Sequence, residues 1–254
     1  MSDVADWWRT EIIDMEPGRI HLRGTPIQEL IGQVGLAEMI WLMVRGDRPD
    51  AAQARLFEAA LVSAVDHGPQ APSIAAARMA VTCGLPLNNA MATAVNMLGD
   101  VHGGAGEQAV EMFHALQRAE SVAAGLDGWI AARGKIIPGY GHRFHTPVDP
   151  RAPRLMALTR EAVAAGACSG AFMALGEAVA AELAARKGRP IPMNIDGATA
   201  VIYAELGFAP PLARGLFCLS RSVGILAHAW EQQQQGGRNK GPTPPQYRWT
   251  YDGP

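Results

Sequence analysis

The sequence has few cysteines and no long apolar run, which excludes several protein classes. Its 254 residues include three cysteines, Cys83, Cys168 and Cys218, and these lie too far apart for a CxxC metal motif or an evident disulfide set. A reducing compartment is therefore expected, and with it a cytoplasmic location. No apolar run approaches the roughly 18 residues of a transmembrane helix. The N-terminus is acidic where a signal peptide would be basic and then apolar.

Basic residues are too few and too scattered for a protein that binds nucleic acid. The formal net charge is −2, and no run of lysines or arginines occurs. A phosphate or carboxylate ligand still fits, because it needs only local positive charge. A length of 254 residues leaves room for one large domain or for one domain with a mobile subdomain. Because hydrophobic residues make up 48% of the chain, a substantial core is expected.

Strand patterns are nearly absent, and the hydrophobic spacing predicts helix over most of the chain. Apolar residues recur at helical intervals among many alanines, and no Asn-Gly or Asp-Gly turn separates alternating runs. The predicted helices cover residues 26–44, 50–66, 73–82, 86–98, 105–118, 198–206 and 212–235, with two more between 150 and 187. One extended patch over 19–24 predicts a short N-terminal arm. The predicted fold class is all-α.

Three loops between the predicted helices carry side chains that are suited to catalysis or binding. In the first loop, His102 precedes two glycines and the predicted start of a helix at Ala105. Glycines let a substrate approach the backbone, and a helix N-terminus favours developing negative charge. This histidine could therefore polarise a carbonyl oxygen, and a histidine in an ordinary turn is the alternative interpretation.

The second loop places His142 after Pro-Gly-Tyr-Gly and directly before Arg143, with Arg151 a short distance beyond. Arginines suit carboxylates and phosphates because a guanidinium donates two parallel hydrogen bonds, and solvated loop arginines are the alternative. His142 and His145 are spaced i, i+3, as metal ligands can be. No strong ligand motif such as HExxH accompanies them, so we predict no metal site.

The third loop ends in Asn-Ile-Asp-Gly and places Asp196 at the start of an apolar helix. A carboxylate in apolar surroundings has a raised pKa and becomes a better base, although capping of the helix is a competing interpretation. Farther along, Arg221 is the one charged residue within the apolar run 216–226. A buried arginine on a helix needs an anionic partner, which is either protein or ligand.

Taken in chain order, these motifs resemble the citrate synthase superfamily over nearly the whole chain. HGGAGEQ (102–108) and IPGYGHRFHTPVDPRAPRL (137–155) are similar to its two catalytic-histidine segments. NIDGATAV (194–201) is similar to the segment with the catalytic aspartate, and CLSRSVGILAHAWEQ (218–232) to the helix with a carboxylate-binding arginine. Within the superfamily, VDHGPQAPS (65–73) and the short length resemble the citryl-CoA lyase domain of ATP-citrate lyase.

The resemblance implies a site with three catalytic residues. Asp196 would remove a methyl proton from acetyl-CoA, His102 would hydrogen-bond the thioester oxygen, and His142 would protonate the oxaloacetate carbonyl. Four side chains would hold the dicarboxylate: His67, Arg143, Arg151 and Arg221. The entrance for coenzyme A would be lined by Ile137, Pro138, Gly139, Tyr140 and Gly141. A coenzyme A thioester is thus expected as a substrate, with no permanently bound cofactor.

The implied reaction is the reversible cleavage of citryl-CoA to acetyl-CoA and oxaloacetate. One alternative is condensation of an acyl-CoA with oxaloacetate followed by thioester hydrolysis, as in citrate synthase. Another is a non-catalytic sensor of acyl-CoA or dicarboxylate. His102 is typical of the synthases, whereas the lyase domain of ATP-citrate lyase has an apolar residue there. The Arg-Pro motif that synthases supply from a partner subunit is absent, and Arg238 or Arg248 could replace it.

The resemblance also implies how the chain is organised. Residues 1–254 are expected to form a single domain with a small mobile subdomain over roughly 106–208 and a C-terminal arm over 236–254. The arm carries three alternating aromatic residues, Tyr247, Trp249 and Tyr251. Alternation would put all three on one side of an extended arm, where they could pack on a partner. Family members are homodimers, so we expect a homodimer or a higher homo-oligomer.

Overall fold

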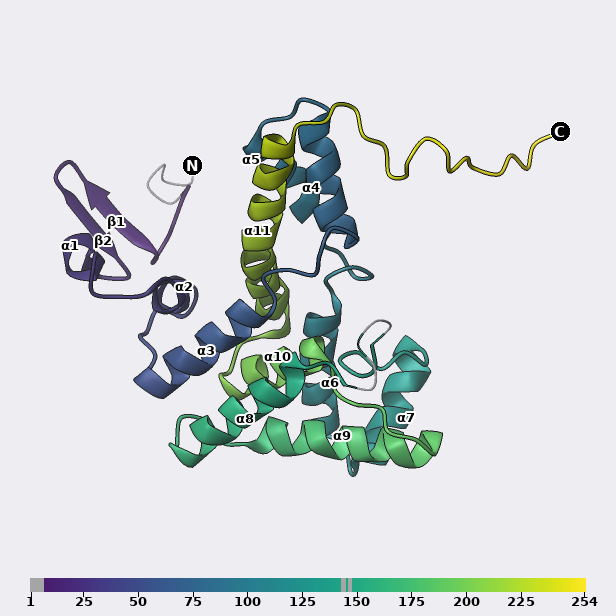
Figure 1. The fold of residues 1–254 in the computed structure, drawn as a ribbon. Helices are drawn as coiled ribbons and strands as arrows, with labels where there is room; N and C mark the ends of the chain where they lie inside the picture. The colour runs from purple at the N-terminus through teal and green to yellow at the C-terminus, as the bar shows by residue number, and fades with distance from the viewer. Residues whose placement is uncertain (1–6, 143–144, 146–147) are drawn as a thin grey trace.

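Helices dominate the structure, and a small sheet lies at its N-terminal end (Figure 1). The computed structural model describes residues 7–142, 145 and 148–254. The helices in this part of the chain are α1 (Ile27–Leu30), α2 (Leu36–Arg45), α3 (Ala51–Ser63), α4 (Pro72–Thr82), α5 (Leu87–Val95), α6 (Ala105–Gln117), α7 (Val122–Arg133), α8 (Arg151–Ala164), α9 (Ala171–Lys187), α10 (Ile195–Glu205) and α11 (Pro210–Gln235). The predicted helical fold is confirmed. None of these described helices combines the length and apolarity that crossing a membrane requires.

The N-terminal patch that was expected to be an extended arm is one strand of a three-stranded antiparallel sheet. Its strands are β1 (Ile13–Glu16), β2 (Arg19–Leu22) and β3 (Thr25–Pro26), paired in the order β1-β2-β3. The turn between β2 and β3 uses Arg23 and Gly24, whose φ angles of 49° and 80° are typical of tight hairpin turns. Such short strands show no clear alternation, so the sequence predicted only one of them.

Most predicted helices form within a few residues of their expected ends. Asp50 caps α3, because its carboxylate accepts hydrogen bonds from the N–H groups of Ala52 and Gln53 at 2.8 Å. The prediction of one helix over 26–44 is wrong: α1 and α2 are separate, and Gly32 between them has φ +76°. Helix α7 was not predicted, because its apolar residues do not form a single stripe.

Two hydrophobic clusters position the elements that carry the candidate site. The larger cluster surrounds α10, whose residues from Gly197 to Ala204 are all buried among α3, α6, α8 and α9. The smaller one lies between α4, α5 and the C-terminal half of α11, where alanines allow the helices to pack closely. Helix α11 is long enough to contribute residues to both clusters (Figure 1). The loops that precede α4, α6 and α10 therefore meet beside α11.

Candidate active site

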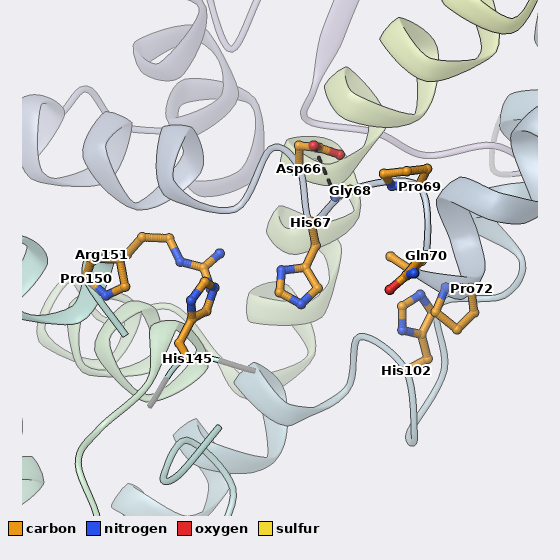
Figure 2. A pocket seen from close by; sticks show the side chains of 11 residues that line it. Asp66, His67, Gly68, Pro69, Gln70, Pro72, His102, His145, Pro150 and Arg151 are labelled. Carbon is orange, nitrogen blue, oxygen red and sulfur yellow. Dashed lines mark hydrogen bonds between the residues drawn. The ribbon is translucent and has the colours of Figure 1, made fainter. Parts of the chain in front are cut away.

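Two adjoining cavities lie where these loops meet. The first, which we call the aspartate cavity, has a volume of about 500 Å³ and includes Asp196 and Arg221 in its lining. The second, the loop cavity, has a volume of about 700 Å³ and is bordered by the 66–72 loop. They share the lining residues His67, Pro72, His102 and Arg151. Figure 2 shows the His67 ring between His102 on one side and Arg151 with His145 on the other.

The structure brings together most of the side chains that the sequence singled out. Six of them line the aspartate cavity: His67, His102, His142, Arg151, Asp196 and Arg221. They come from segments that lie up to about 150 residues apart in the chain, as the positions of His67 and Arg221 show. Arg143 lies outside the described residues.

The segment expected at the coenzyme A entrance packs mainly against the chain before α10. Pro138, Gly139 and Tyr140 are buried, and Ile137 packs on the core. The Tyr140 hydroxyl donates to the Gly176 carbonyl at 2.8 Å. Among the five residues expected there, Gly141 lines the aspartate cavity. The contacts of the others are internal to the fold.

Close backbone packing joins the second and third loops. The Asn194 N–H donates to the Gly139 carbonyl at 2.9 Å, and the Asn194 side-chain amide donates to the Gly141 carbonyl at 2.6 Å. A Cβ on Gly139, whose φ is +85°, would lie 2.6 Å from the Cα of Gly197, so only glycine fits here. These contacts hold the loop of His142 beside the first turn of α10.

Asp196 lies in that first turn but does not cap the helix. The N-cap is Asn194, whose Oδ1 accepts hydrogen bonds from the N–H groups of Asp196 at 2.9 Å and Gly197 at 3.2 Å. The capping interpretation of Asp196 is therefore wrong. Within the described part of the chain, its carboxylate receives no hydrogen bond. Burial raises the pKa of Asp196 against the opposing charges of Arg151 and Arg221, as suits a general base.

His102 is held by the first turn of α4. The N–H of Ser73 donates to Nε2 of His102 at 3.2 Å, and Ser73 Oγ lies 3.0 Å from the same nitrogen. Nε2 must therefore lack a proton, so the neutral ring carries its proton on Nδ1. Burial and the charge of Arg221 lower the pKa of His102, which favours this neutral form at pH 7. The ring can act as a neutral hydrogen-bond donor on the cavity wall.

His142 belongs to a cluster of three histidines. Its ring centroid lies 5.6 Å from that of His67 and 4.6 Å from that of His145. The N–H of His145 donates to Nδ1 of His142 at 2.9 Å, so the neutral His142 ring carries its proton on Nε2. Burial and the neighbouring positive groups lower the pKa of both His67 and His142. Both rings are therefore expected to be mainly neutral at pH 7.

Arg151 is aligned by Asp149, a residue that the sequence analysis did not single out. The guanidinium donates to both carboxylate oxygens at 2.9 and 2.8 Å, and the same carboxylate accepts from the Ile195 N–H at 3.1 Å. Burial raises the pKa of Asp149, but the hydrogen bonds from Arg151 and Ile195 outweigh it and lower the value to about 2. The Nη1 group of Arg151 is not used in this pair and can bind an anionic ligand.

Arg221 is buried on α11 and needs anionic neighbours. Its Nε donates to the Ala64 carbonyl at 3.1 Å, and its guanidinium carbon lies 4.8 Å from the centre of the Phe217 ring. Burial lowers the pKa of Arg221, and the charges of Asp66 and Asp196 oppose that effect. An anionic ligand in the aspartate cavity would add to this compensation.

The supporting residues were harder to find from the sequence than the reactive ones. Asn194 had a usable signal, because an asparagine directly before an apolar helix is a typical N-cap. Ser73 bonds to His102, 29 residues away. Asp149 pairs with the nearby Arg151 and also bonds to Ile195, 46 residues away, and no local pattern indicates these distant contacts. Among the described residues, no group of three or more His, Cys, Asp or Glu side chains is placed to hold a metal ion.

Comparisons with known proteins agree with this arrangement of motifs. The family described as "Citrate synthase, C-terminal domain" matches residues 35–243. The citrate synthase of Heyndrickxia coagulans is 31% identical over 212 residues, which make up 82% of this chain and 55% of the relative. The chain therefore spans about half the length of the curated relatives it matches.

Solved structures extend the likeness to almost the entire chain. The citryl-CoA lyase from Hydrogenobacter thermophilus has a TM-score of 0.88 and 32% identity, and the match covers 98% of this chain and 95% of that one. ATP citrate lyase from Methanothrix soehngenii has a TM-score of 0.84 at 22% identity, over 97% of this chain and 42% of that one, which shows a common fold. From the matched family and these relatives, we conclude that the chain belongs to the citrate synthase family of enzymes.

Proposed function

We propose that this protein is a citryl-CoA lyase, which cleaves citryl-CoA to acetyl-CoA and oxaloacetate. The observation that carries the proposal is the likeness to the citryl-CoA lyase of Hydrogenobacter thermophilus, which covers 95% of that chain at 32% identity. The citrate synthase from Thermotoga maritima has a lower TM-score of 0.70 at 25% identity, against 0.88 for the lyase. The greater structural likeness therefore favours the lyase.

The chemistry is simplest to follow in the direction of condensation. Asp196 removes a proton from the acetyl-CoA methyl group, and the enolate oxygen accepts a hydrogen bond from Nδ1–H of His102. The enolate carbon attacks the ketone carbon of oxaloacetate, whose oxygen takes the Nε2 proton of His142 and becomes the citryl hydroxyl. The proton that Asp196 removed is then passed to His142, so both residues return to their starting forms and no net proton is taken up or released. Cleavage runs these steps backwards: the Nε2 proton of His142 passes to Asp196, His142 takes the hydroxyl proton in its place, the carbon–carbon bond breaks, and Asp196 gives its proton to the enolate carbon.

The dicarboxylate end of the substrate is bound by Arg151, Arg221 and His67. Arg151 is fixed by Asp149 and Arg221 by the Ala64 carbonyl, so both guanidinium groups lose little freedom when the acid binds. Arg143 is proposed as a fourth contact on the resemblance alone. Neutral His67 contributes a hydrogen bond without adding a third positive charge to the site.

A citrate synthase, which also hydrolyses the citryl thioester, is the second candidate. His102 favours this candidate, because the synthases have a histidine at this position, whereas the lyase domain of ATP-citrate lyase has an apolar residue. A free-thiol assay with acetyl-CoA and oxaloacetate separates the two candidates. A synthase accumulates free coenzyme A at a steady rate, whereas a lyase does not hydrolyse the thioester.

We also propose that residues 106–208 move as a small subdomain. Three cavity residues, His142, Arg151 and Asp196, belong to this range, and three others, His67, His102 and Arg221, lie outside it. Movement of one group against the other would open and close the aspartate cavity. Such closure would admit the coenzyme A thioester and then exclude water from the enolate.

A homodimer is the proposed assembly. Four apolar side chains, Leu219, Val223, Leu226 and Trp230, recur every three or four residues along α11 and are each between 42% and 57% exposed. A contiguous exposed apolar stripe indicates an interaction surface. The C-terminal arm runs away from the body in Figure 1, and its three aromatic residues are exposed. A symmetric partner would cover both features.

A further inference from the structure

The loop that carries His67 is fastened to one face of α11. Arg221 Nε donates to the Ala64 carbonyl at 3.1 Å, and the Gly224 N–H donates to the Val65 carbonyl at 3.1 Å. A Cβ on Gly224 would collide with the Val65 carbonyl oxygen, so the loop lies directly on the helix. One turn farther along α11, the side chain of His228 meets the same loop.

His228 connects Arg78 on α4 to Asp66 in this loop. Arg78 Nη1 lies 3.0 Å from Nδ1 of His228, and Nε2 of His228 lies 3.2 Å from Oδ1 of Asp66. A guanidinium can only donate, so Nδ1 must accept and the neutral His228 ring carries its proton on Nε2. The His228 ring therefore donates to the Asp66 carboxylate, and its side chain is largely shielded from solvent.

Asp66 in turn holds the turn that presents His67. Its Oδ2 accepts from the Gly68 N–H at 3.1 Å, as the dashed line in Figure 2 shows. Burial raises the pKa of Asp66, but the hydrogen bonds from the Gly68 N–H, from His228 and from the His67 N–H outweigh it and lower the value. The carboxylate thus joins α11 to the backbone on both sides of the His67 side chain. The ring itself projects between the two walls of the cavity (Figure 2).

We propose that His228 is a positioning residue for dicarboxylate binding: its hydrogen bond to Asp66 fixes the 66–68 turn and thereby the place of the His67 ring. The inference rests on the proposed function, in which His67 contacts the dicarboxylate. His228 lines neither cavity, so it acts through Asp66. The alternative role is a brace between α4 and α11, since Arg78 also donates to Glu231 and Gln235.

Two substitutions at His228 separate these roles. In His228→Gln, the glutamine side chain is long enough to keep an N–H donor near the Asp66 carboxylate. In His228→Asn, the shorter side chain can still accept from Arg78 but does not reach Asp66. We expect His228→Asn to raise the KM for oxaloacetate by at least about five-fold, with kcat within about two-fold and the KM for acetyl-CoA unchanged. His228→Gln should behave like the wild type. The matched control is His114→Asn on α6, whose ring packs on Phe172 away from the site.

A measurement without substrate accompanies the kinetics. The amide NMR signal of Gly68 should move in His228→Asn and keep its position in His228→Gln. An unchanged oxaloacetate KM in a folded His228→Asn variant overturns the inference and indicates a brace, because this variant keeps the partner for Arg78. An equal loss in both variants overturns it as well, because the donor to Asp66 that glutamine retains would then have no effect. Should His228→Asn not fold, Asp66→Asn tests the same bond, and an unchanged KM there has the same meaning. A wild-type protein that neither binds oxaloacetate nor turns over refutes the proposed function itself, and the positioning role with it.

Discussion

Asn194 accepts a hydrogen bond from the backbone N–H of Asp196 at 2.9 Å, so the cap of α10 and the candidate base are different residues. The amide side chain stabilises the helix start, and the carboxylate two positions later remains unbonded within the described structure. Because Asn194 also bonds to the Gly141 carbonyl, the same residue ties the His142 loop to the helix. The capping role of Asn194 and the proposed catalytic role of Asp196 can therefore be tested separately, at positions two residues apart.

Asp196→Asn should lower the rate by at least about two orders of magnitude, the usual scale for loss of a general base. Exchange of the acetyl-CoA methyl protons with solvent, followed by NMR, should be lost with it. The melting temperature should not fall, because the substitution removes a carboxylate whose pKa burial has raised. Asn194→Ala is the contrasting variant and should cost about 1 kcal/mol of stability through the lost cap. Near-normal turnover in a folded Asp196→Asn protein would end the assignment.

Arg151→Gln and Arg221→Gln should each weaken oxaloacetate binding by several-fold or more, because charge-assisted hydrogen bonds are lost. Affinity for coenzyme A should change little. Calorimetric titration with each ligand checks both statements. Arg160→Gln, on the exposed face of α8 beside Glu177, is a control that should leave both affinities unchanged. Normal oxaloacetate binding in both cavity variants would mean that these arginines are structural.

Ionised Asp149 should stabilise the folded protein, and this contribution to the free energy of unfolding should be lost at low pH. Its pKa is lowered from the ordinary value of 3.8 to about 2 in the folded protein, so the unfolded chain takes up the proton first as the pH falls. The resulting stability is complete above about pH 4 and is lost as the pH falls towards about 2. The difference in unfolding free energy between the wild type and Asp149→Asn should follow this course in denaturant titrations. A difference that stays constant down to pH 2 would contradict the assigned pKa.

If the exposed apolar stripe of α11 forms the proposed dimer interface, a charged substitution in it should dissociate the dimer. Val223→Asp places a charge in an apolar interface and should produce monomers, as sedimentation velocity would show. Deletion of residues 242–254 should loosen the dimer and lower activity while helix content stays almost unchanged. Arg55→Asp, on the exposed surface of α3, is a control for added negative charge. If Val223→Asp remains dimeric, the stripe is not part of the dimer interface.

Much of the fold was predictable because its signals are local. Asp50 caps the start of α3 and Gly46, in the left-handed conformation, ends α2, and each acts within a single turn. The error over 26–44 arose because hydrophobic spacing continues through a glycine that the backbone uses to change direction. Helix α7 was not predicted for the opposite reason, since it has no single apolar face.

The sequence predicted which side chains meet at the aspartate cavity, but it did not predict the residues that support them. His102 and Asp196 stand beside glycines and helix starts, which the sequence displays directly. The proton position on His102, however, depends on the N–H of Ser73 in another helix. The orientation of Arg151 likewise depends on Asp149, whose burial results from packing against α10. Such tertiary contacts decide the electrostatics of the site and leave no local pattern.

The most direct test of the account is to incubate the purified protein with citryl-CoA and to identify every product by mass spectrometry. A citryl-CoA lyase yields acetyl-CoA and oxaloacetate in equal amounts, and Asp196→Asn should abolish both. Citrate and free coenzyme A as the main products would contradict the lyase proposal and favour a synthase. Unchanged citryl-CoA, under conditions in which the protein is folded, would contradict the proposed chemistry as a whole.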